Sequence, residues 1–258
     1  MPFQANQQTV SGRGMMTTIT NTQSGQSERV FVPTFPEGTP LAKAATTLNV
    51  ALDSFAGNVR NNVAQFLPEV VPQNLRAAAK NVLAEPLVAF QNEAIAFRQT
   101  TDKAVAVAMS VVPATIATAG IRGRAVKQFD AADIAAKAAM LQNFTLEQMS
   151  GLVEVGALDQ LPDGIAQAAR DRFMVMSHVA RTGLQAQYQK VATVNDPLAS
   201  GADVDAAMAA AQAALDALKA RSATVTDAAN VLRSMTTAVA LACDLSVDPA
   251  YALLTNAN

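Results

Sequence analysis

Apolar residues recur at helical spacing through most of the chain from Pro40 onward, and this pattern constrains the fold more than any other feature. In residues 40–67, Leu41, Leu48 and Phe55 repeat on one face of a helix. Comparable runs cover residues 73–112, 129–141, 145–158 and 161–194. The sequence therefore predicts an all-α, multi-helix bundle of about seven to nine helices.

Several residues mark where these helices begin or bend. Pro40 and Pro162 suit the first turn of a helix, where a missing N–H costs nothing. Thr145 followed by Gln148 has the spacing of a capping box, in which each side chain bonds the other residue's backbone. Pro86 lies inside the 73–112 run, so a bend or break is predicted there.

The C-terminal third carries two apolar seams with the same spacing of 4, 3, 4 and 3 residues. The first is Val204, Met208, Ala211, Leu215 and Leu218, and the second is Ala228, Leu232, Met235, Val239 and Ala242. Such seams are typical of helices that pack side by side. With a break expected near Thr224 or Thr226, they predict an antiparallel helical hairpin.

The first 40 residues differ from the rest, because they are rich in Gln, Thr, Asn and Ser and have no helical period. They predict an extended polar N-terminal arm. Within it, Val30, Val32 and Phe35 suit a short edge strand or a strap on a neighbouring molecule, and a partly ordered tail is the alternative.

Four segments follow from these patterns. They are the arm (1–40), a helical domain (41–160), a long helix plus hairpin (161–245) and a C-terminal tail (246–258).

Composition excludes some functions. Charged residues make up 16% of the chain, against a usual share of about 25%. The net charge of −2 argues against a broad basic surface for nucleic acid. The absence of Trp argues against stacking sites for bases. No secretory leader is expected from the N-terminal residues.

No catalytic, cofactor or metal site is predicted, so we do not expect an enzyme or a small-molecule substrate. His178 is the only histidine, and Cys243 lies on an apolar helix face, where a buried thiol is expected. The phosphate-binding, dinucleotide-binding and nucleophile-elbow motifs are missing. The closest carboxylate pairs, Asp130 with Asp133 and Asp203 with Asp205, are expected at helix starts.

A basic stretch in residues 120–127 carries Arg122, Arg124 and Lys127 beside two glycines. A flexible basic loop of this kind is a candidate for contact with phosphate or nucleic acid. The alternative is a solvated turn between two helices.

Residues 104–121 carry no charge and have about the length that a bilayer span needs, roughly 20 residues. Six alanines and a central Pro113 make the stretch a weak membrane segment. We therefore predict a buried helix, in the core or at a subunit interface; a membrane segment is possible but not favoured.

Low charge, small-residue helices and a polar arm together favour contact with other molecules. The leading hypothesis is a structural, assembly-forming protein. Its organisation resembles that of virion components of bacteriophages and helical-coat viruses, which implies packing against copies of itself or other virion proteins. Its location would then be the virion, and otherwise the cytoplasm. The alternative is a helical protein of lipid or polymer surfaces, or an ejected virion protein that inserts through residues 104–121.

Overall fold

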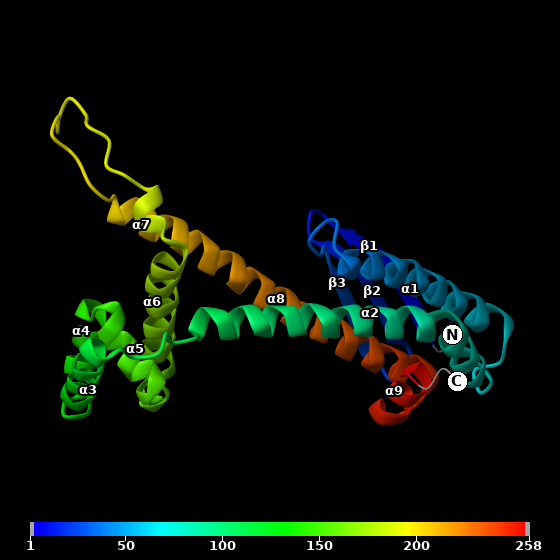
Figure 1. The fold of residues 1–258 in the computed structure, drawn as a ribbon. Coiled ribbons are helices and arrows are strands. Elements are labelled where there is room, and N and C mark those ends of the chain that lie inside the picture. The colour runs from blue at the N-terminus through cyan, green and yellow to red at the C-terminus, as the bar shows by residue number, and fades with distance from the viewer. Residues whose placement is uncertain (1–2, 256–258) are drawn as a thin grey trace. The chain divides into compact units, whose positions relative to one another are not determined.

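The structure, a computed structural model, describes residues 3–255. The chain is mostly helical, as predicted, with one small sheet near its N-terminus (Figure 1). It divides into two compact units, which we call unit 1 (residues 1–100 and 221–258) and unit 2 (residues 101–220). Residues 1–2 and 256–258, at the outer ends of the predicted arm and tail, lie outside the described residues.

The predicted arm forms the sheet of unit 1. Strands β1 (Phe3–Val10), β2 (Gly14–Asn21) and β3 (Ser27–Pro33) pair antiparallel in the order β1-β2-β3. The segment is therefore extended, as expected, but its strands pair with one another instead of forming a free arm. Pairing satisfies the backbone hydrogen bonds that a lone polar strand would leave to water.

Val30, Val32 and Phe35 are buried in the core of unit 1. β3 is an edge strand, as predicted. However, Val30 and Val32 of this strand, and Phe35 just beyond its end, are buried in the chain's own core, where Phe35 meets Phe90 edge-on at 5.6 Å between ring centres. These three side chains therefore stabilise unit 1 itself, in place of the contact with a neighbour that a strap would make.

Helix α1 (Pro40–Gln65) covers the sheet and begins as predicted. Pro40 occupies its first turn, and the Thr39 hydroxyl accepts a hydrogen bond from the Ala42 N–H at 3.1 Å. One side of the helix, including Leu48 and Phe55, is fully buried. The apolar spacing in this region therefore identified both the helix and its core face.

Helix α2 (Val71–Met109) continues through Pro86, so of the bend or break predicted there the break is absent. A proline inside a helix costs about 3 kcal/mol. Leu83 and Leu87, on either side of it, are completely buried in the core of unit 1. Burial of such side chains contributes about 1.5–3 kcal/mol each, which offsets that cost.

The predicted C-terminal hairpin is wrong, because residues 204–243 form one continuous helix, α8 (Val204–Cys243). The Thr226 hydroxyl, expected to cap a new helix, instead donates to the Ser222 carbonyl within α8 at 3.3 Å. No glycine or proline occurs between Gly201 and Pro249, so nothing in the sequence interrupts the helix. A short helix, α9 (Val247–Thr255), follows in unit 1 and buries Ala250 and Leu254.

Unit 2 contains mostly short helices. They are α3 (Ile116–Asp130), α4 (Ile134–Asn143), α5 (Leu146–Glu154), the 3-10 turn η1 (Ala157–Gln160), α6 (Asp163–Thr182) and α7 (Leu184–Gln187). Phe129, Met149, Leu152 and Phe173 form the centre of its core. The run predicted as one helix over 161–194 ends earlier, because Gly183 adopts a left-handed conformation (φ 65°) that terminates α6.

Residues 104–121 do not form the buried helix that we predicted. α2 ends at Met109, residues 110–115 are not helical, and α3 begins at Ile116, with Val112 and Ile116 exposed to solvent. Pro113 lacks an N–H and disfavours helical geometry at the residue before it, which explains the break.

Among the described residues, no single helix is long and apolar enough to span a membrane. Helices α8 and α9 pass the length and composition test only when taken together, and they are bent by 106°.

Candidate functional site

The basic residues of the 120–127 stretch lie on helix α3, so the expected flexible loop or turn is wrong. A capping box between Thr115 and Thr118 starts this helix, with the Thr118 N–H bonding the Thr115 hydroxyl at 3.2 Å. This cap fixes the first turn and allows the helix to run through Gly120 and Gly123.

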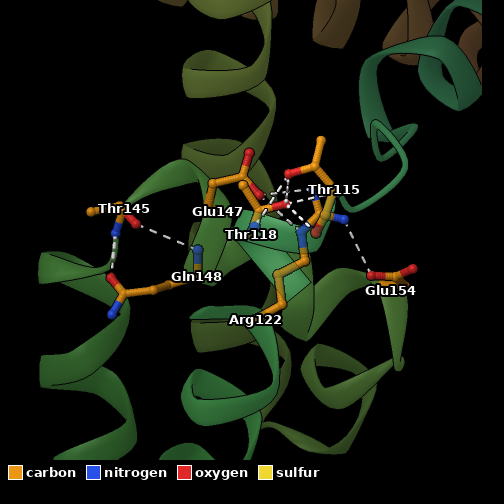
Figure 2. A network of polar contacts seen from close by, with 7 residues as sticks. All are labelled: Thr115, Thr118, Arg122, Thr145, Glu147, Gln148 and Glu154. Carbon is orange, nitrogen blue, oxygen red and sulfur yellow. Dashed lines mark hydrogen bonds and ion pairs between the residues drawn. The ribbon is translucent and has the colours of Figure 1, made fainter. Parts of the chain in front are cut away.

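Arg122 is buried, with 4% of its surface exposed. Its Nε donates to Glu147 Oε2 at 2.9 Å, and a terminal nitrogen donates to Glu154 Oε2 at 3.3 Å. Figure 2 shows this guanidinium between the two carboxylates of α5. The predicted phosphate ligand is therefore already paired with two anions inside unit 2, and its charge holds α3 to α5.

The start of α5 is as predicted. Thr145 and Gln148 form a capping box, in which the Thr145 N–H donates to Gln148 Oε1 at 2.8 Å and the Gln148 N–H donates to the Thr145 hydroxyl at 3.4 Å (Figure 2). The cap orients α5 so that Glu147, one residue into its first turn, reaches Arg122.

Arg124 and Lys127 remain exposed on α3. Arg124 Nε donates to the Gly120 carbonyl of its own helix at 3.3 Å, a bond that leaves most of the guanidinium in solvent. Of the three basic residues predicted to contact phosphate or nucleic acid, Arg124 and Lys127 are therefore accessible to an anion, and Arg122 is not.

The cysteine and the aspartates considered for catalysis are buried or lie at helix ends. Cys243 is fully buried as predicted, and burial raises the pKa of its thiol to about 12. Asp133 caps α4 and Asp203 caps α8, each accepting a bond from a backbone N–H three residues on. Asp130 ends α3, so its expected place at a helix start is wrong. Within residues 3–255, no three His, Cys, Asp or Glu side chains group as metal ligands.

Unit 2 exposes many large apolar side chains, a feature that the sequence patterns did not reveal. We call the following set the apolar surface of unit 2: Val107, Val112, Ile116, Ile121, Ile134, Val155, Tyr188, Val191, Val194, Leu198 and Val204. Scattered exposed apolar residues are normal in monomeric proteins, whereas several on one element, such as Val191, Val194 and Leu198 on the stretch between α7 and α8, are typical of surfaces that contact other molecules.

Part of this surface is a loop between α7 and α8, here named the 188–203 loop. Its base is closed by two backbone bonds, from the Lys190 N–H to the Gly201 carbonyl and from the Asp203 N–H to the Tyr188 carbonyl, both 2.8 Å. The Thr193 N–H donates to the Asp196 carbonyl at 3.0 Å near the tip. The loop extends beyond the neighbouring helices α7 and α8 (Figure 1).

Unit 1 carries a cleft of about 510 Å³ between the β1–β2 turn, the end of β3 and one face of α1; we call it the α1 cleft. Its volume lies within the range of ligand pockets, roughly 300–1,000 Å³. Val32, Phe35 and Ala45, which line it, are buried, and Arg13 and Glu37, which also line it, are exposed. Asn49 lines it too, and its Oδ1 is buried without a hydrogen-bond donor.

The structure thus offers two surfaces for contact, the apolar surface of unit 2 and the α1 cleft of unit 1. Sequence patterns missed both, because exposure of an apolar residue depends on how distant segments pack. No protein-family model, curated protein or solved structure matches this chain.

Proposed function

We propose that this protein is a structural component of an assembly, in which it packs against copies of itself. The observation that carries the proposal is the apolar surface of unit 2, where Val194 is 99% exposed and Leu198 is 87% exposed. Leaving such side chains in water forgoes about 1.5–3 kcal/mol each, which association recovers. The low share of charged residues supports the same proposal, because weak charge repulsion lets copies approach.

A virion, of a phage or a helical-coat virus, is the assembly that we propose. The support is an organisation of small-residue helices and low charge, together with two accessible basic residues, Arg124 and Lys127, for enclosed nucleic acid. Other virion proteins are the additional partners in this proposal.

The test is the native mass of the purified chain over a wide range of concentrations, followed by electron microscopy of the largest species. We expect mass to rise with concentration and regular particles, sheets or filaments to form. A chain that stays monomeric at every concentration contradicts the proposal.

A second candidate, a protein of lipid surfaces, is favoured by the break at residues 110–115. Val112 and Ile116 lie exposed beside it, within a stretch that carries no charge from Ala104 to Ile121. Flotation with liposomes tests this candidate. Binding that disappears when Ile116 is replaced by Asp, in a chain that still folds, supports the lipid surface over self-assembly.

A further inference from the structure

Strand β1 has backbone hydrogen-bonding groups without a partner along one side. It lies at the edge of the sheet and pairs only with β2. In an antiparallel pair, successive residues direct their N–H and C=O alternately toward the partner strand and away from it. The Ala5 carbonyl accepts a hydrogen bond from Arg60 of α1 at 3.2 Å, so Ala5 faces away from β2. By the same alternation Gln7 and Thr9 face away from β2, and within residues 3–255 no group outside β2 is bonded to their backbone.

The turn at the other end of β1 gives the same alternation. The Arg13 N–H donates to the Val10 carbonyl at 2.9 Å, so the Val10 carbonyl points toward the turn and β2. Its neighbour Thr9 therefore faces outward, as the bond at Ala5 also indicates.

This side of β1 is open to solvent. Gln8 and Thr9 are exposed, and Gln7 is half-buried. A hollow of about 360 Å³ lies beside the first half of the strand, lined by Gln4 and Asn6 and by the end of α1. The α1 cleft borders Thr9 in the second half. Helix α1 therefore leaves space beside both halves of the strand.

β1 also lacks the features by which proteins protect exposed strand edges, namely charged residues, proline and bulges. Its sequence, FQANQQTV, contains neither a charge nor a proline, and its register with β2 is unbroken over 8 residues. The opposite edge of the sheet is protected, because β3 carries Glu28, Arg29 and Pro33. In addition, Thr237 of α8 donates to the Glu28 carboxylate at 3.4 Å. Of the two edges, β1 is therefore the one available to another strand.

We propose that β1 of one copy pairs antiparallel with β1 of a second copy, so that the two sheets become one. The unpaired groups identify the occupant, because a row of alternating N–H and C=O groups is matched by another extended strand. β1 of a second copy is such a strand, with the same unpaired side and no charge that would repel it. This inference rests on the self-association proposed above and assigns one of its contacts.

One register satisfies all the outward-facing residues. A two-fold axis at Asn6 places Phe3 opposite Thr9 of the other copy. It likewise places Ala5 opposite Gln7. All four of these residues face away from β2, so the pairs exchange backbone hydrogen bonds. The Ala5 carbonyl takes part as well, because it has a second lone pair beside the one that α1 uses.

The exposed side chains of β1 match in the same register. Gln4, Asn6 and Gln8 lie on the face of the sheet away from the core, and all three are exposed. The axis places the two Asn6 residues opposite each other and Gln4 opposite Gln8. Side-chain amides both donate and accept, so these pairs bond as Asn and Gln ladders do. A shift by one residue would place outward-facing residues opposite inward-facing ones and lose the backbone bonds.

The contact is isologous, because both copies use the same strand, and it therefore closes into a dimer. Growth beyond the dimer then depends on a different surface, for which the apolar surface of unit 2 is the candidate. The proposed assembly thus has two kinds of contact, a backbone contact through β1 and an apolar contact through unit 2.

The first experiment places like charges on the two-fold axis and measures native mass by sedimentation. Asn6→Lys brings two ammonium groups together in the dimer, and like charges directly opposite each other oppose strand pairing. Phe31→Lys is the matched control, because it adds the same charge to the same face of the sheet on the far edge strand, where Phe31 is 38% exposed. We expect Asn6→Lys to weaken dimerisation about tenfold or more. The control should dimerise like the unchanged chain, and equal weakening by both variants overturns the assignment to the β1 edge.

The second experiment mixes Asn6→Lys with Asn6→Glu. Each variant is repelled by its own copies, whereas one copy of each places opposite charges on the axis. At a concentration where the unchanged chain is dimeric, we expect monomers in the separate solutions and heterodimers in the mixture. Restored dimerisation also establishes that both variants are folded. A mixture that associates no better than its components overturns the proposed pairing.

A third measurement needs no substitution. Amide hydrogen exchange at Gln7 and Thr9 should slow as the unchanged chain associates, because the pairing bonds their N–H groups. Exchange that is equally fast in the monomer and the dimer overturns the pairing. Should Asn6→Lys fail to fold, this measurement decides the proposal.

Further results separate the inference from the proposal beneath it. Val194→Asp with Leu198→Asp alters two highly exposed apolar positions of unit 2 and leaves β1 intact, so this variant should form dimers and nothing larger. Association that Asn6→Lys does not weaken overturns the β1 contact and leaves self-association in place. Monomeric behaviour of the unchanged chain overturns both.

Discussion

Gly151 of α5 lies directly against the backbone of Arg122 in α3. A Cβ placed on Gly151 would be 2.8 Å from the Arg122 Cβ and 2.9 Å from its Cα. The glycine therefore sets the closest approach of the two helices, and the Arg122 side chain extends from this crossing to its two carboxylates.

Gly151→Ala should destabilise unit 2, because rigid backbone atoms occupy the space that the methyl group needs. Overpacking of this kind costs about 1–3 kcal/mol. Urea unfolding followed by circular dichroism measures the loss. Gly123→Ala is the matched control, since no atom lies within 4 Å of its Cβ position in α3. The control should stabilise the chain by about 0.5–1 kcal/mol, and equal behaviour of the two variants would contradict the close crossing.

Replacing both Glu147 and Glu154 by Gln should lower the free energy of unfolding more than either single change. The double variant leaves a buried guanidinium without a counter-charge, which costs about 3 kcal/mol, whereas each single variant keeps one ion pair. A double-mutant cycle in urea measures the coupling. Arg122→Met, which removes the charge and keeps an apolar side chain, should be tolerated better than the double change.

Cys243 should make stability fall at alkaline pH. Burial raises the pKa of its thiol from 9.0 to about 12, so the folded state holds a proton that the unfolded state loses. The sign follows from linkage: this contribution is complete below pH 9 and disappears as the pH rises toward 12. The measurement is the free energy of unfolding of the unchanged chain and of Cys243→Ala between pH 8 and 11. The two values should converge as the pH rises. A difference that stays constant over this range would contradict the prediction.

Ala223→Pro should destabilise the chain by about 3 kcal/mol or more, because position 223 lies in the middle of α8. Ala223→Gly, the control, should cost about 1 kcal/mol. In the hairpin that the seams suggested, residue 223 would be part of a connection and proline would be tolerated there. The difference in unfolding free energy between the two variants thus reports directly whether the helix is continuous.

Arg124→Ala with Lys127→Ala should leave stability within about 0.5 kcal/mol, because both side chains are exposed. If the assembly encloses nucleic acid, the same variant should retain less of it, and the salt dependence of binding should become shallower. Arg122 is unsuitable for this test, since its side chain is buried and already paired with Glu147 and Glu154. Unchanged nucleic-acid content in a folded, assembled variant would remove α3 from that role.

Local sequence signals identified the local structure well. The start of α1 at Pro40, the capping box of Thr145 and Gln148 and the burial of Cys243 each depend on residues close in sequence, and all three are confirmed. The predictions failed where the structure depends on interactions between residues distant in sequence, or on competing local preferences. Two matching seams do not show whether a break separates them, and α8 continues because no glycine or proline interrupts its connecting residues.

The sheet and the contact surfaces could not be predicted from the sequence, for a related reason. In the polar stretch FQANQQTV of β1, the buried residue is Phe3, so alternation gave almost no strand signal. Its structure comes from pairing with β2, in which Gln4 lies opposite Thr20, sixteen residues further along the chain. The exposure of Val194 and the orphan oxygen of Asn49 likewise depend on packing, which periodicity does not report.

Unit 1 is assembled from both ends of the chain, with residues 101–220 inserted between them. On a ribosome, residues 101–220 emerge before the segment that completes the core of unit 1, including Met235 and Val239. Unit 1 therefore reaches its final stability only after residues 221–258 have emerged. Until then the growing polypeptide shows an incomplete core, and premature termination anywhere before residue 221 leaves that core without its last helices.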